Sequence, residues 1–327
     1  MGVFWEKIQG DAMSGRGITA ADALTILRLP QAEIWPLLEV SETVRRHFKG
    51  DQIRLCSIVN AKSGHCSEDC SFCSQSSRSN AAIEKYPLME EDEIVMAARD
   101  AKQRGAREFS IVASGLSMRN PRELERVGNA IERIRTDVGV ETCVSLGALS
   151  AENVSLLLSR GLRSVHHNLE TARRFFPSIC TTHDYEEDVR TVREAKAAGA
   201  WVCSGGIFGI GETLEDRVEL AMTLRELDVD SIPVNFLNPI EGTPLDGKSE
   251  LTPFGCLKII AMMRLCHPAR EIIICGGRAV NLRDLQGLIF AAGATGMMIG
   301  NYLTTAGRPV EDDLRMIEDL GLGVRSL

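Results

Sequence analysis

Glu108-Phe-Ser-Ile-Val-Ala113 and Glu141-Thr-Cys-Val-Ser-Leu146 are two short runs rich in apolar and β-branched residues, as is typical of buried strands. Between them, residues 121–138 carry apolar side chains at helical spacing, and Gly139 stands where that helix should end. A strand, a crossover helix and a second strand predict two parallel strands of one sheet.

The same alternation continues over most of the chain. Strands are expected at 53–59, 108–113, 141–146, 162–169, 200–207, 230–236, 271–275 and 295–299. Helical patterns follow at about 90–105, 121–138, 150–160, 185–199, 213–227, 252–267, 281–293 and 311–320. Eight such units predict an α/β fold, a closed (β/α)8 TIM-type barrel, with a doubly wound open sheet as the alternative. In such a barrel, the chemistry is expected at the carboxyl ends of the strands.

The first 50 residues differ, because they predict helices without strands. Thr19 can cap a first helix, Pro30 stops it, and Gly50 ends a second helical run. We therefore expect an N-terminal helical extension over residues 1–50 and the barrel over residues 51–327.

Composition excludes several classes of protein. The chain has 327 residues, of which 44% are hydrophobic and 25% charged, so it is not intrinsically disordered. Its net charge of −8 argues against a general nucleic-acid binder, and no run approaches the 18 apolar residues of a membrane span. It has ten cysteines, and its N-terminus lacks the long apolar stretch of an export signal. We therefore expect a cytoplasmic protein whose clustered thiols bind metal or react.

Three cysteines lie in Cys66-Ser-Glu-Asp-Cys70-Ser-Phe-Cys73, soon after the first expected strand. Thiolates at this spacing can converge on one centre, and they favour zinc, copper(I) or an iron–sulfur cluster. A [4Fe–4S] cluster held by three cysteines would leave one iron open to an exogenous ligand. The alternatives are a zinc site completed by His65 or a distant residue, and a chance group of thiols.

Cys-x3-Cys-x-Phe-Cys after strand one of a β/α barrel resembles the motif of the radical S-adenosylmethionine (SAM) enzymes. The resemblance implies that Cys66, Cys70 and Cys73 hold a catalytic [4Fe–4S] cluster whose open iron binds SAM. Reduction would cleave SAM to methionine and a 5′-deoxyadenosyl radical, which removes hydrogen from an unactivated carbon. The protein would position the cofactor against its substrate and exclude water.

A longer set of motifs is similar to the biotin synthases within that superfamily. The matching segments are 64–76, 167–171, 181–182, Tyr185, 202–207, 209–213, 233–235, 242–245, 292–294 and 300–301. The resemblance implies a sulfurtransferase that converts dethiobiotin to biotin, using SAM twice. A second, auxiliary iron–sulfur cluster inside the barrel would supply the sulfur.

The resemblance also implies roles for single residues. Those expected to contact SAM are Phe72, Ala113, Asn168, Glu170, Gly205, Ile207 and Glu212. Arg173 is a further candidate for the SAM carboxylate, because a guanidinium can form two parallel hydrogen bonds, with a surface role as the alternative. Those expected to contact the substrate are His166, Asn168 and Asn235. The amide of Asn235 suits a ureido group, whereas His166 stands where the biotin synthases more often have asparagine.

The auxiliary cluster is where the sequence departs from this resemblance. The best-known biotin synthases bind a [2Fe–2S] cluster with three cysteines and an arginine. Cys143 and Cys203 match two of those positions, but Ser110 and Ile273 stand at the other two. The usual [2Fe–2S] assignment is therefore the less favoured one.

Two other cysteines suggest a replacement. Cys275 lies at the end of the seventh expected strand and Cys56 within the first. Because alternate strands of a barrel share a layer, these two are expected to join Cys143 and Cys203 around an all-cysteine cluster, with four irons favoured over two. Cys180 is the rival fourth ligand. The simpler alternative is that the strand cysteines are only small core residues.

The resemblance further implies a flavodoxin or ferredoxin as reductant, iron–sulfur assembly proteins that rebuild the auxiliary cluster, and a homodimer. No nucleic acid or membrane is expected as a partner. Two rival functions stay open at this point. One is a related radical SAM enzyme, such as an [FeFe]-hydrogenase maturase or a methylornithine synthase, and the other is a non-enzymatic iron–sulfur carrier. A carrier would not need the SAM motifs at Asn168, Glu170 and 205–212.

Overall fold

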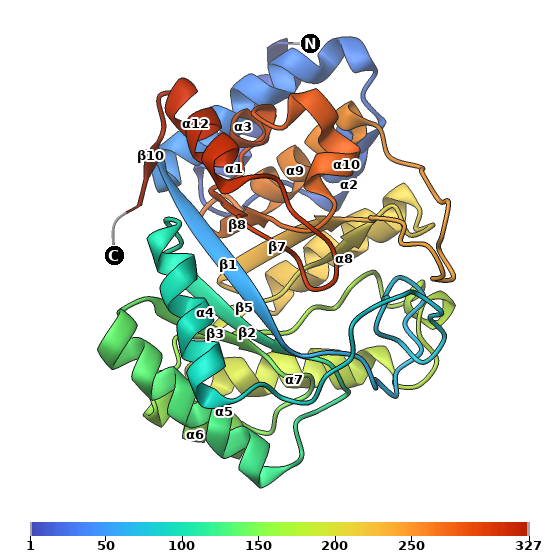
Figure 1. Ribbon diagram of the computed structural model, residues 1–327. Helices are drawn as coiled ribbons and strands as arrows, with labels where there is room; N and C mark the ends of the chain where they lie inside the picture. The colour runs from blue at the N-terminus through green and yellow to red at the C-terminus, as the bar shows by residue number, and fades with distance from the viewer. Residues whose placement is uncertain (1, 326–327) are drawn as a thin grey trace.

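The computed structural model describes residues 2–325 and contains a closed barrel of parallel strands (Figure 1). The barrel strands are β1 (Gln52–Lys62), β2 (Glu108–Ala113), β3 (Glu141–Ser145), β4 (Ser164–His166), β5 (Trp201–Cys203), β6 (Gly206–Phe208), β7 (Ser231–Phe236), β8 (Glu271–Ile274) and β9 (Gly296–Met298). β1 pairs with both β2 and β9, which closes the ring. β5 pairs with β4, and β6 continues the same run to pair with β7, so residues 2–325 form eight staves. The predicted (β/α)8 barrel is confirmed.

Helices surround the barrel close to the residue ranges expected from the sequence. They are α4 (Glu91–Gln103), α5 (Pro121–Arg133), α6 (Ala151–Ser159), α7 (Tyr185–Ala197), α8 (Leu214–Glu226), α9 (Pro253–Cys266), α10 (Arg278–Leu282), α11 (Leu288–Ala291) and α12 (Val310–Asp319). The hydroxyls of Ser150, Thr213 and Thr252 each accept a backbone N–H at a helix start. The single helix expected over 281–293 is divided into α10 and α11, because Arg283 adopts a φ of 51° that no α-helix contains.

Three helices precede the barrel: α1 (Gly2–Met13), α2 (Ala20–Arg28) and α3 (Ile34–Lys49). They pack over α9 and α8, and α9 is buried along nearly its whole length for that reason (Figure 1). β10 (Gly323–Val324) adds a short parallel pairing at the start of β1. Over the described residues, no helix combines the length and apolar character that crossing a membrane requires.

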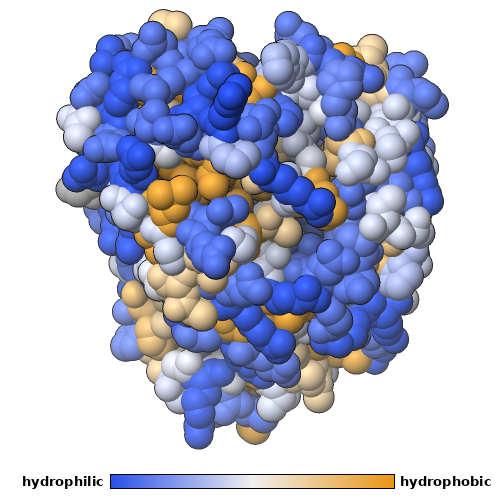
Figure 2. Space-filling model, turned by 90° about the horizontal axis from the view of Figure 1, so that it is seen from below, coloured by the Kyte–Doolittle hydropathy of each residue, from blue (hydrophilic) through white to orange (hydrophobic). Residues whose placement is uncertain are grey.

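Large apolar side chains are mostly inside this arrangement. Those that remain exposed are scattered singly over different helices, among them Trp35, Met96 and Leu156. The surface seen from below is accordingly mostly hydrophilic, and its hydrophobic residues show in separate groups spread over that face (Figure 2). A larger cavity lies inside the barrel.

A buried ion pair fixes the C-terminal helix to the barrel. Nη2 of Arg278, at the start of α10, lies 2.7 Å from Oδ2 of Asp313 on α12, and each side chain is 1% exposed. Nη1 of Arg278 donates to Gln286, and Arg308 also faces Asp313. The guanidinium of Arg278 is thus committed to this contact between two helices.

Asp313→Ala should lower the free energy of unfolding by about 3 kcal/mol, because it leaves a buried guanidinium without its charged partner. Chemical denaturation of the cluster-free protein measures this. Asp312→Ala is the matched control. The carboxylate of Asp312 is half-exposed and pairs with Arg315, so its removal should lower the free energy of unfolding by under about 0.5 kcal/mol. Equal losses in the two variants would contradict the argument.

Candidate active site

A cavity of about 380 Å³ fills the inside of the barrel. It extends from Arg54 and Glu108, near the start of their strands, to the loops that follow β1, β7 and β9. Ion pairs close the lower end: Nη2 of Arg54 lies 2.6 Å from Glu108 and 3.4 Å from Glu141, and its Nη1 lies 3.9 Å from Glu271. The cavity is therefore open only toward the carboxyl ends of the strands, where a barrel enzyme carries its chemistry.

Four thiols line the deeper part of this cavity. They belong to Cys56 on β1, Cys143 on β3, Cys203 on β5 and Cys275 directly after β8. These strands are the first, third, fifth and seventh staves, whose inward side chains share layers. Burial raises the pKa of Cys143 to about 12 and that of Cys203 well above its ordinary value. A hydrogen bond with Cys275 raises the pKa of Cys56.

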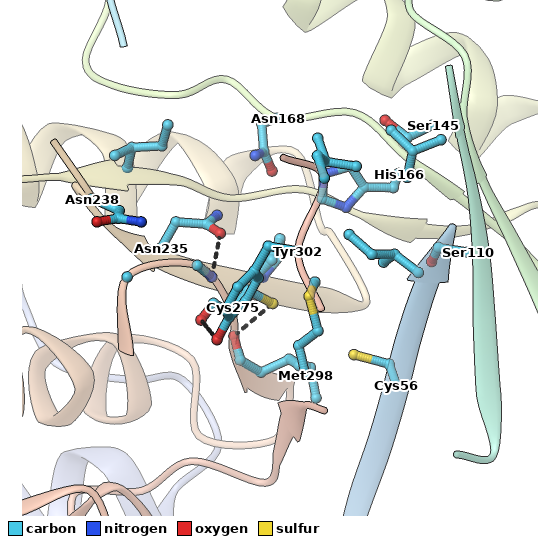
Figure 3. Close-up of a pocket in the computed structure, with 18 of the residues that line it drawn as sticks. Cys56, Ser110, Ser145, His166, Asn168, Asn235, Asn238, Cys275, Met298 and Tyr302 are labelled. Atoms are coloured by element: carbon cyan, nitrogen blue, oxygen red, sulfur yellow. Dashed lines mark hydrogen bonds between the residues drawn. The ribbon is translucent and has the colours of Figure 1, made fainter. Parts of the chain in front are cut away.

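Ser110 on β2, labelled in Figure 3, and Ile273 on β8 also line this cavity. Ser110 pairs in register with Cys143, and its hydroxyl lies beside that thiol and lowers its pKa, against the larger effect of burial. Ile273 supplies only hydrocarbon. The donor set at this depth is therefore four cysteines, which suits a thiolate-ligated metal cluster.

The middle of the cavity is polar. His166 at the end of β4, Asn168 and Asn235 on β7 all point into it (Figure 3). The Asn235 amide donates to the carbonyl of Gly206 at 3.2 Å and accepts from the N–H of Gly276 at 2.9 Å. One N–H and one lone pair of that amide remain for a ligand. Burial, with a smaller contribution from His167, lowers the pKa of His166 to about 4, so its imidazole is neutral at physiological pH.

Asn168 and Glu170 are held against the strand that follows them. The Asn168 amide donates to Glu170 at 3.2 Å and accepts from the N–H of Gly205 at 3.1 Å. Glu170 has a φ of 62° and lines the cavity, and burial raises its pKa to about 8. Any Cβ at Gly205 would lie 2.0 Å from the carbonyl oxygen of Pro233, so this close approach requires glycine.

The first cysteine loop lies at the upper end of the cavity. Phe72 and Cys73 line it, and the N–H of Cys73 donates to the carbonyl of Cys70 at 3.1 Å in a tight turn. Burial raises the pKa of Cys73 to about 11, and the nearby Cys66 adds to that effect. The three thiols therefore converge, and the raised pKa of Cys73 means that a metal bound there would displace its proton.

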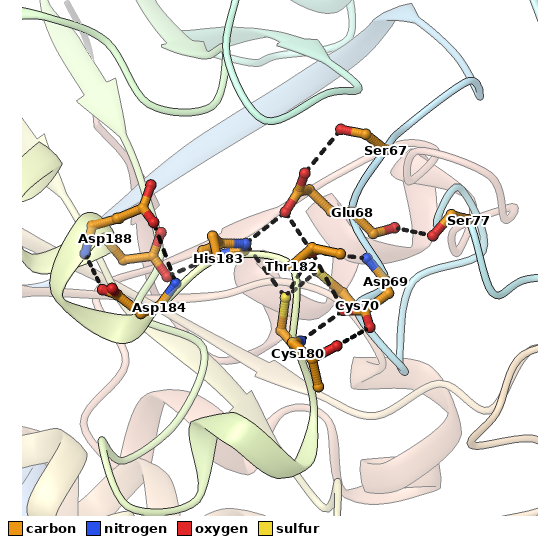
Figure 4. A network of polar contacts seen from close by, with 12 residues as sticks. Ser67, Glu68, Asp69, Cys70, Ser77, Cys180, Thr182, His183, Asp184 and Asp188 are labelled. Atoms are coloured by element: carbon orange, nitrogen blue, oxygen red, sulfur yellow. Dashed lines mark hydrogen bonds and ion pairs between the residues drawn. The ribbon is translucent and has the colours of Figure 1, made fainter.

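Carboxylates just before Cys70 tie this loop to the segment after β4 (Figure 4). Asp69 accepts from the N–H of Thr181 at 2.8 Å and from its hydroxyl at 2.6 Å. Glu68 accepts from the hydroxyl of Thr182 at 2.6 Å and lies 2.7 Å from Nδ1 of His183. Two separate chain segments therefore position the cysteine loop as one unit.

His183 lies at the centre of this network. A hydrogen bond to Asp188 raises its pKa to about 11, and Asp188 also contacts His167 at 2.8 Å. Cys180 contacts both His183 and Cys70, and its hydrogen bond with Cys70 lowers its pKa to about 4. Cys180 therefore lies beside the first cysteine loop, apart from the four thiols of the deep cavity.

Several residues expected to contact SAM lie behind the cavity wall. Glu212 accepts from the N–H groups of Gly209 and Ile210 and from Arg217, so its carboxylate organises the loop itself. Arg173 is 59% exposed, pairs with Glu186 and stacks on the Tyr185 ring at 5.4 Å. Ile207 lines the cavity, whereas Ala113, at the end of β2, packs against the hydrophobic core.

Sequence reasoning missed the segment after β9. Tyr302, Leu303, Thr304 and Thr305 form part of the cavity mouth. The Tyr302 hydroxyl donates to the carbonyl of Cys275 at 3.2 Å (Figure 3). The hydroxyl of Thr304 lies 2.8 Å from that of Ser74 in the first cysteine loop. The sequence offered one indication of their role: they directly follow the last barrel strand, where residues of a barrel site are expected.

Comparison with known proteins agrees with this geometry. Residues 62–224 match the Radical SAM superfamily, and residues 233–323 match the Biotin and Thiamin Synthesis associated domain. The fold is similar to that of methylornithine synthase, with a TM-score of 0.84 and 22% identity over 98% of this chain and 97% of that one. It is also similar to an FeFe-hydrogenase maturase from Carboxydothermus hydrogenoformans, with a TM-score of 0.82 and 16% identity over 97% of this chain and 78% of that one. The chain is a radical SAM enzyme.

Full-length relatives narrow the family. The chain is 51% identical over 321 residues to the biotin synthase of Geotalea daltonii, covering 98% of both. It is 52% identical over 320 residues to that of Geobacter sulfurreducens, covering 98% of this chain and 97% of that protein. The chain belongs to the biotin synthase family, and the alternative of a non-enzymatic carrier is not favoured.

The lowered pKa of His166 predicts a pH dependence of stability. The unfolded state, with a histidine pKa near 6.5, binds the proton more tightly than the folded state, so the stabilisation is complete above pH 6.5 and is lost as the pH falls toward 4. Lowering the pH from 7.5 to 5.5 should therefore reduce the free energy of unfolding by about 1.4 kcal/mol through this histidine. His166→Asn should remove that part of the pH dependence. Urea denaturation of the cluster-free protein at both pH values measures it. His47→Asn, exposed on α3, is the control, and equal pH slopes for wild type and His166→Asn would refute the prediction.

Proposed function

We propose that the chain converts dethiobiotin to biotin, taking sulfur from an auxiliary iron–sulfur cluster. One observation carries the proposal: a single cavity has the first cysteine loop at its mouth and four thiols at its depth. A substrate between them would face a radical source on one side and a sulfur source on the other. The relatives that share half of this sequence are named biotin synthases, which supplies the identity of the substrate.

The first cluster is assigned to Cys66, Cys70 and Cys73. Three convergent thiols fit a [4Fe–4S] cluster with one open iron, and the bound cluster supplies the electron that cleaves SAM. Phe72, Asn168, Glu170 and Ile207 are assigned to SAM, because they line the same cavity as Cys73. Gly205 and Glu212 support the SAM site from behind, and Ala113 and Arg173 are assigned as its more distant members.

Substrate is assigned to the polar middle of the cavity. The free N–H and lone pair of Asn235 match the carbonyl and N–H of a ureido ring. Neutral His166 can donate to or accept from the same ring without adding charge to a buried site. Asn168 is assigned to both ligands, because it lines the same cavity and donates to Glu170 at 3.2 Å.

The auxiliary cluster is assigned to Cys56, Cys143, Cys203 and Cys275. All four donors are thiols on alternate staves around one cavity, whereas Ser110 and Ile273 offer neither the third cysteine nor the arginine of a conventional [2Fe–2S] site. An all-cysteine, four-iron type is therefore favoured over a two-iron type. Cys180 is not proposed as a ligand, because it lies beside Cys70.

Partners and organisation complete the proposal. A flavodoxin or ferredoxin would reduce the first cluster, iron–sulfur assembly proteins would rebuild the auxiliary one, and two chains would form a homodimer in the cytoplasm. We also assign residues 1–50 to a helical extension and residues 51–327 to the barrel. The packing of α1–α3 on α8 and α9, ahead of β1, supports that division.

An anaerobic assay tests the function. Reconstituted protein is incubated with reductant, SAM and dethiobiotin, and mass spectrometry follows 5′-deoxyadenosine and biotin. Wild type should form both, Cys66→Ala neither, and Cys203→Ala 5′-deoxyadenosine without biotin, because only the sulfur source is damaged. Cys256→Ala, a buried cysteine on α9, is the control and should retain both products. Wild type that forms 5′-deoxyadenosine but no biotin would refute the substrate.

Iron counting tests the auxiliary site separately. In a variant with Cys66, Cys70 and Cys73 all changed to alanine, reconstituted protein should retain about four irons per chain with a four-iron Mössbauer spectrum. Adding Cys275→Ala should reduce that iron at least about twofold, because one of four ligands is lost, whereas adding Cys256→Ala should not. An ordinary [2Fe–2S] spectrum in the triple variant would overturn the all-cysteine assignment.

A further inference from the structure

Cys180 has no part in the proposed reaction, yet its sulfur lies against a proposed cluster ligand. Sγ of Cys180 is 3.8 Å from Sγ of Cys70. Cys180 is buried and Cys70 half-buried, and they are 110 residues apart in the chain. The contact is therefore a product of the fold and not of local sequence.

The two backbones around this contact are tied together on both sides of it. The N–H of Ser71 donates to the carbonyl of Ile179 at 2.8 Å, and the N–H of Asp69 donates to the hydroxyl of Thr182 at 3.2 Å. The N–H of Thr181 donates to Asp69 at 2.8 Å. Cys70 and Cys180 thus lie opposite each other on two chain segments that these bonds hold side by side.

A disulfide requires the sulfurs to approach to about 2.05 Å, so a further movement of about 1.8 Å is needed. Rotation about the Cα–Cβ bonds moves a sulfur by that much while the backbone bonds stay in place. When Cys70 binds iron its sulfur is occupied, so the movement becomes available only after the first cluster is lost.

We propose that Cys70 and Cys180 form a disulfide when the first cluster is lost to oxygen. In this step the two thiols lose two protons and two electrons, the S–S bond forms, and dioxygen takes the electrons and protons to become hydrogen peroxide. The inference rests on the proposed role of Cys70 as a cluster ligand. The disulfide keeps Cys70 at a reversible oxidation level, since a thiol reductant restores it, whereas sulfinic and sulfonic acids are permanent losses.

Peptide mapping tests the disulfide directly. Cluster-loaded protein is divided, and one half is exposed to air until its visible absorption is lost. Both halves are alkylated and digested with trypsin without reductant. The aerobic sample should contain peptide 63–78 joined to peptide 175–190, with fragmentation assigning the bond to Cys70 and Cys180, and the anaerobic sample should lack it. Cys180 fully alkylated after air exposure, or Cys70 joined to Cys66 or Cys73, would overturn the proposal.

The protective effect has its own readout. After air exposure, thiol reduction and anaerobic reconstitution, Cys180→Ala should recover at least about threefold less first-cluster absorption than wild type, with sulfinic acid at Cys70 by mass spectrometry. Cys180→Ser repeats the test with a closer isostere, and Cys256→Ser is the control for losing a buried thiol. Recovery equal to wild type would overturn the protective role.

The iron content before air exposure distinguishes a failure of the disulfide proposal from a failure of the assignment of Cys70 as a cluster ligand. If anaerobic Cys70→Ala holds as much first-cluster iron as wild type, the ligand assignment fails. If that iron is lost but the peptide map shows no bond between Cys70 and Cys180, the ligand assignment stands and the disulfide fails.

Discussion

The hydrogen bonding of β1 to both β2 and β9 is the constraint on which the rest of this structure depends. A closed ring of parallel strands has no free register, so inward side chains of alternate staves must occupy common layers. Cysteines from four distant parts of the chain consequently face one another across a single cavity. An open sheet built from the same strands would have left Cys56 and Cys275 at opposite ends.

The closed lower end of the cavity affects the pKa values of those thiols. Arg54 and its surrounding carboxylates exclude solvent from below, and the raised pKa values of Cys56, Cys143 and Cys203 follow from that burial and from thiol–thiol contact. The raised pKa values favour the protonated form of Cys56, Cys143 and Cys203, so a metal bound there would have to displace their protons. Acquisition of a cluster is therefore expected to be coupled to proton release.

Much of the fold and part of the site could be predicted from the sequence, and the reasons differ by residue. The strands around Cys143 and Cys203 were predictable because apolar runs and capped helices alternate regularly. The position of Cys180 was not, because its contact with Cys70 depends on how two loops fold together over the barrel. Glu212 was identified as part of a motif, but only the structure distinguishes a carboxylate that binds its own loop from one that faces the cavity. The division between α10 and α11 depends on one left-handed residue, Arg283, which no periodicity reports.

A network of side chains holds the first cysteine loop in place, although that loop contains neither helix nor strand. Glu68 and Asp69 lie between Cys66 and Cys70, and both carboxylates are bonded to residues 181–183. His183 is in turn held by Asp188, which also contacts His167, the neighbour of the cavity-lining His166. The loop, the segment after β4 and the polar middle of the cavity are therefore positioned by one connected set of side chains. Since preorganised supports reduce the ordering cost of binding, this set of side chains lowers the cost of holding the cysteine loop ready for a ligand.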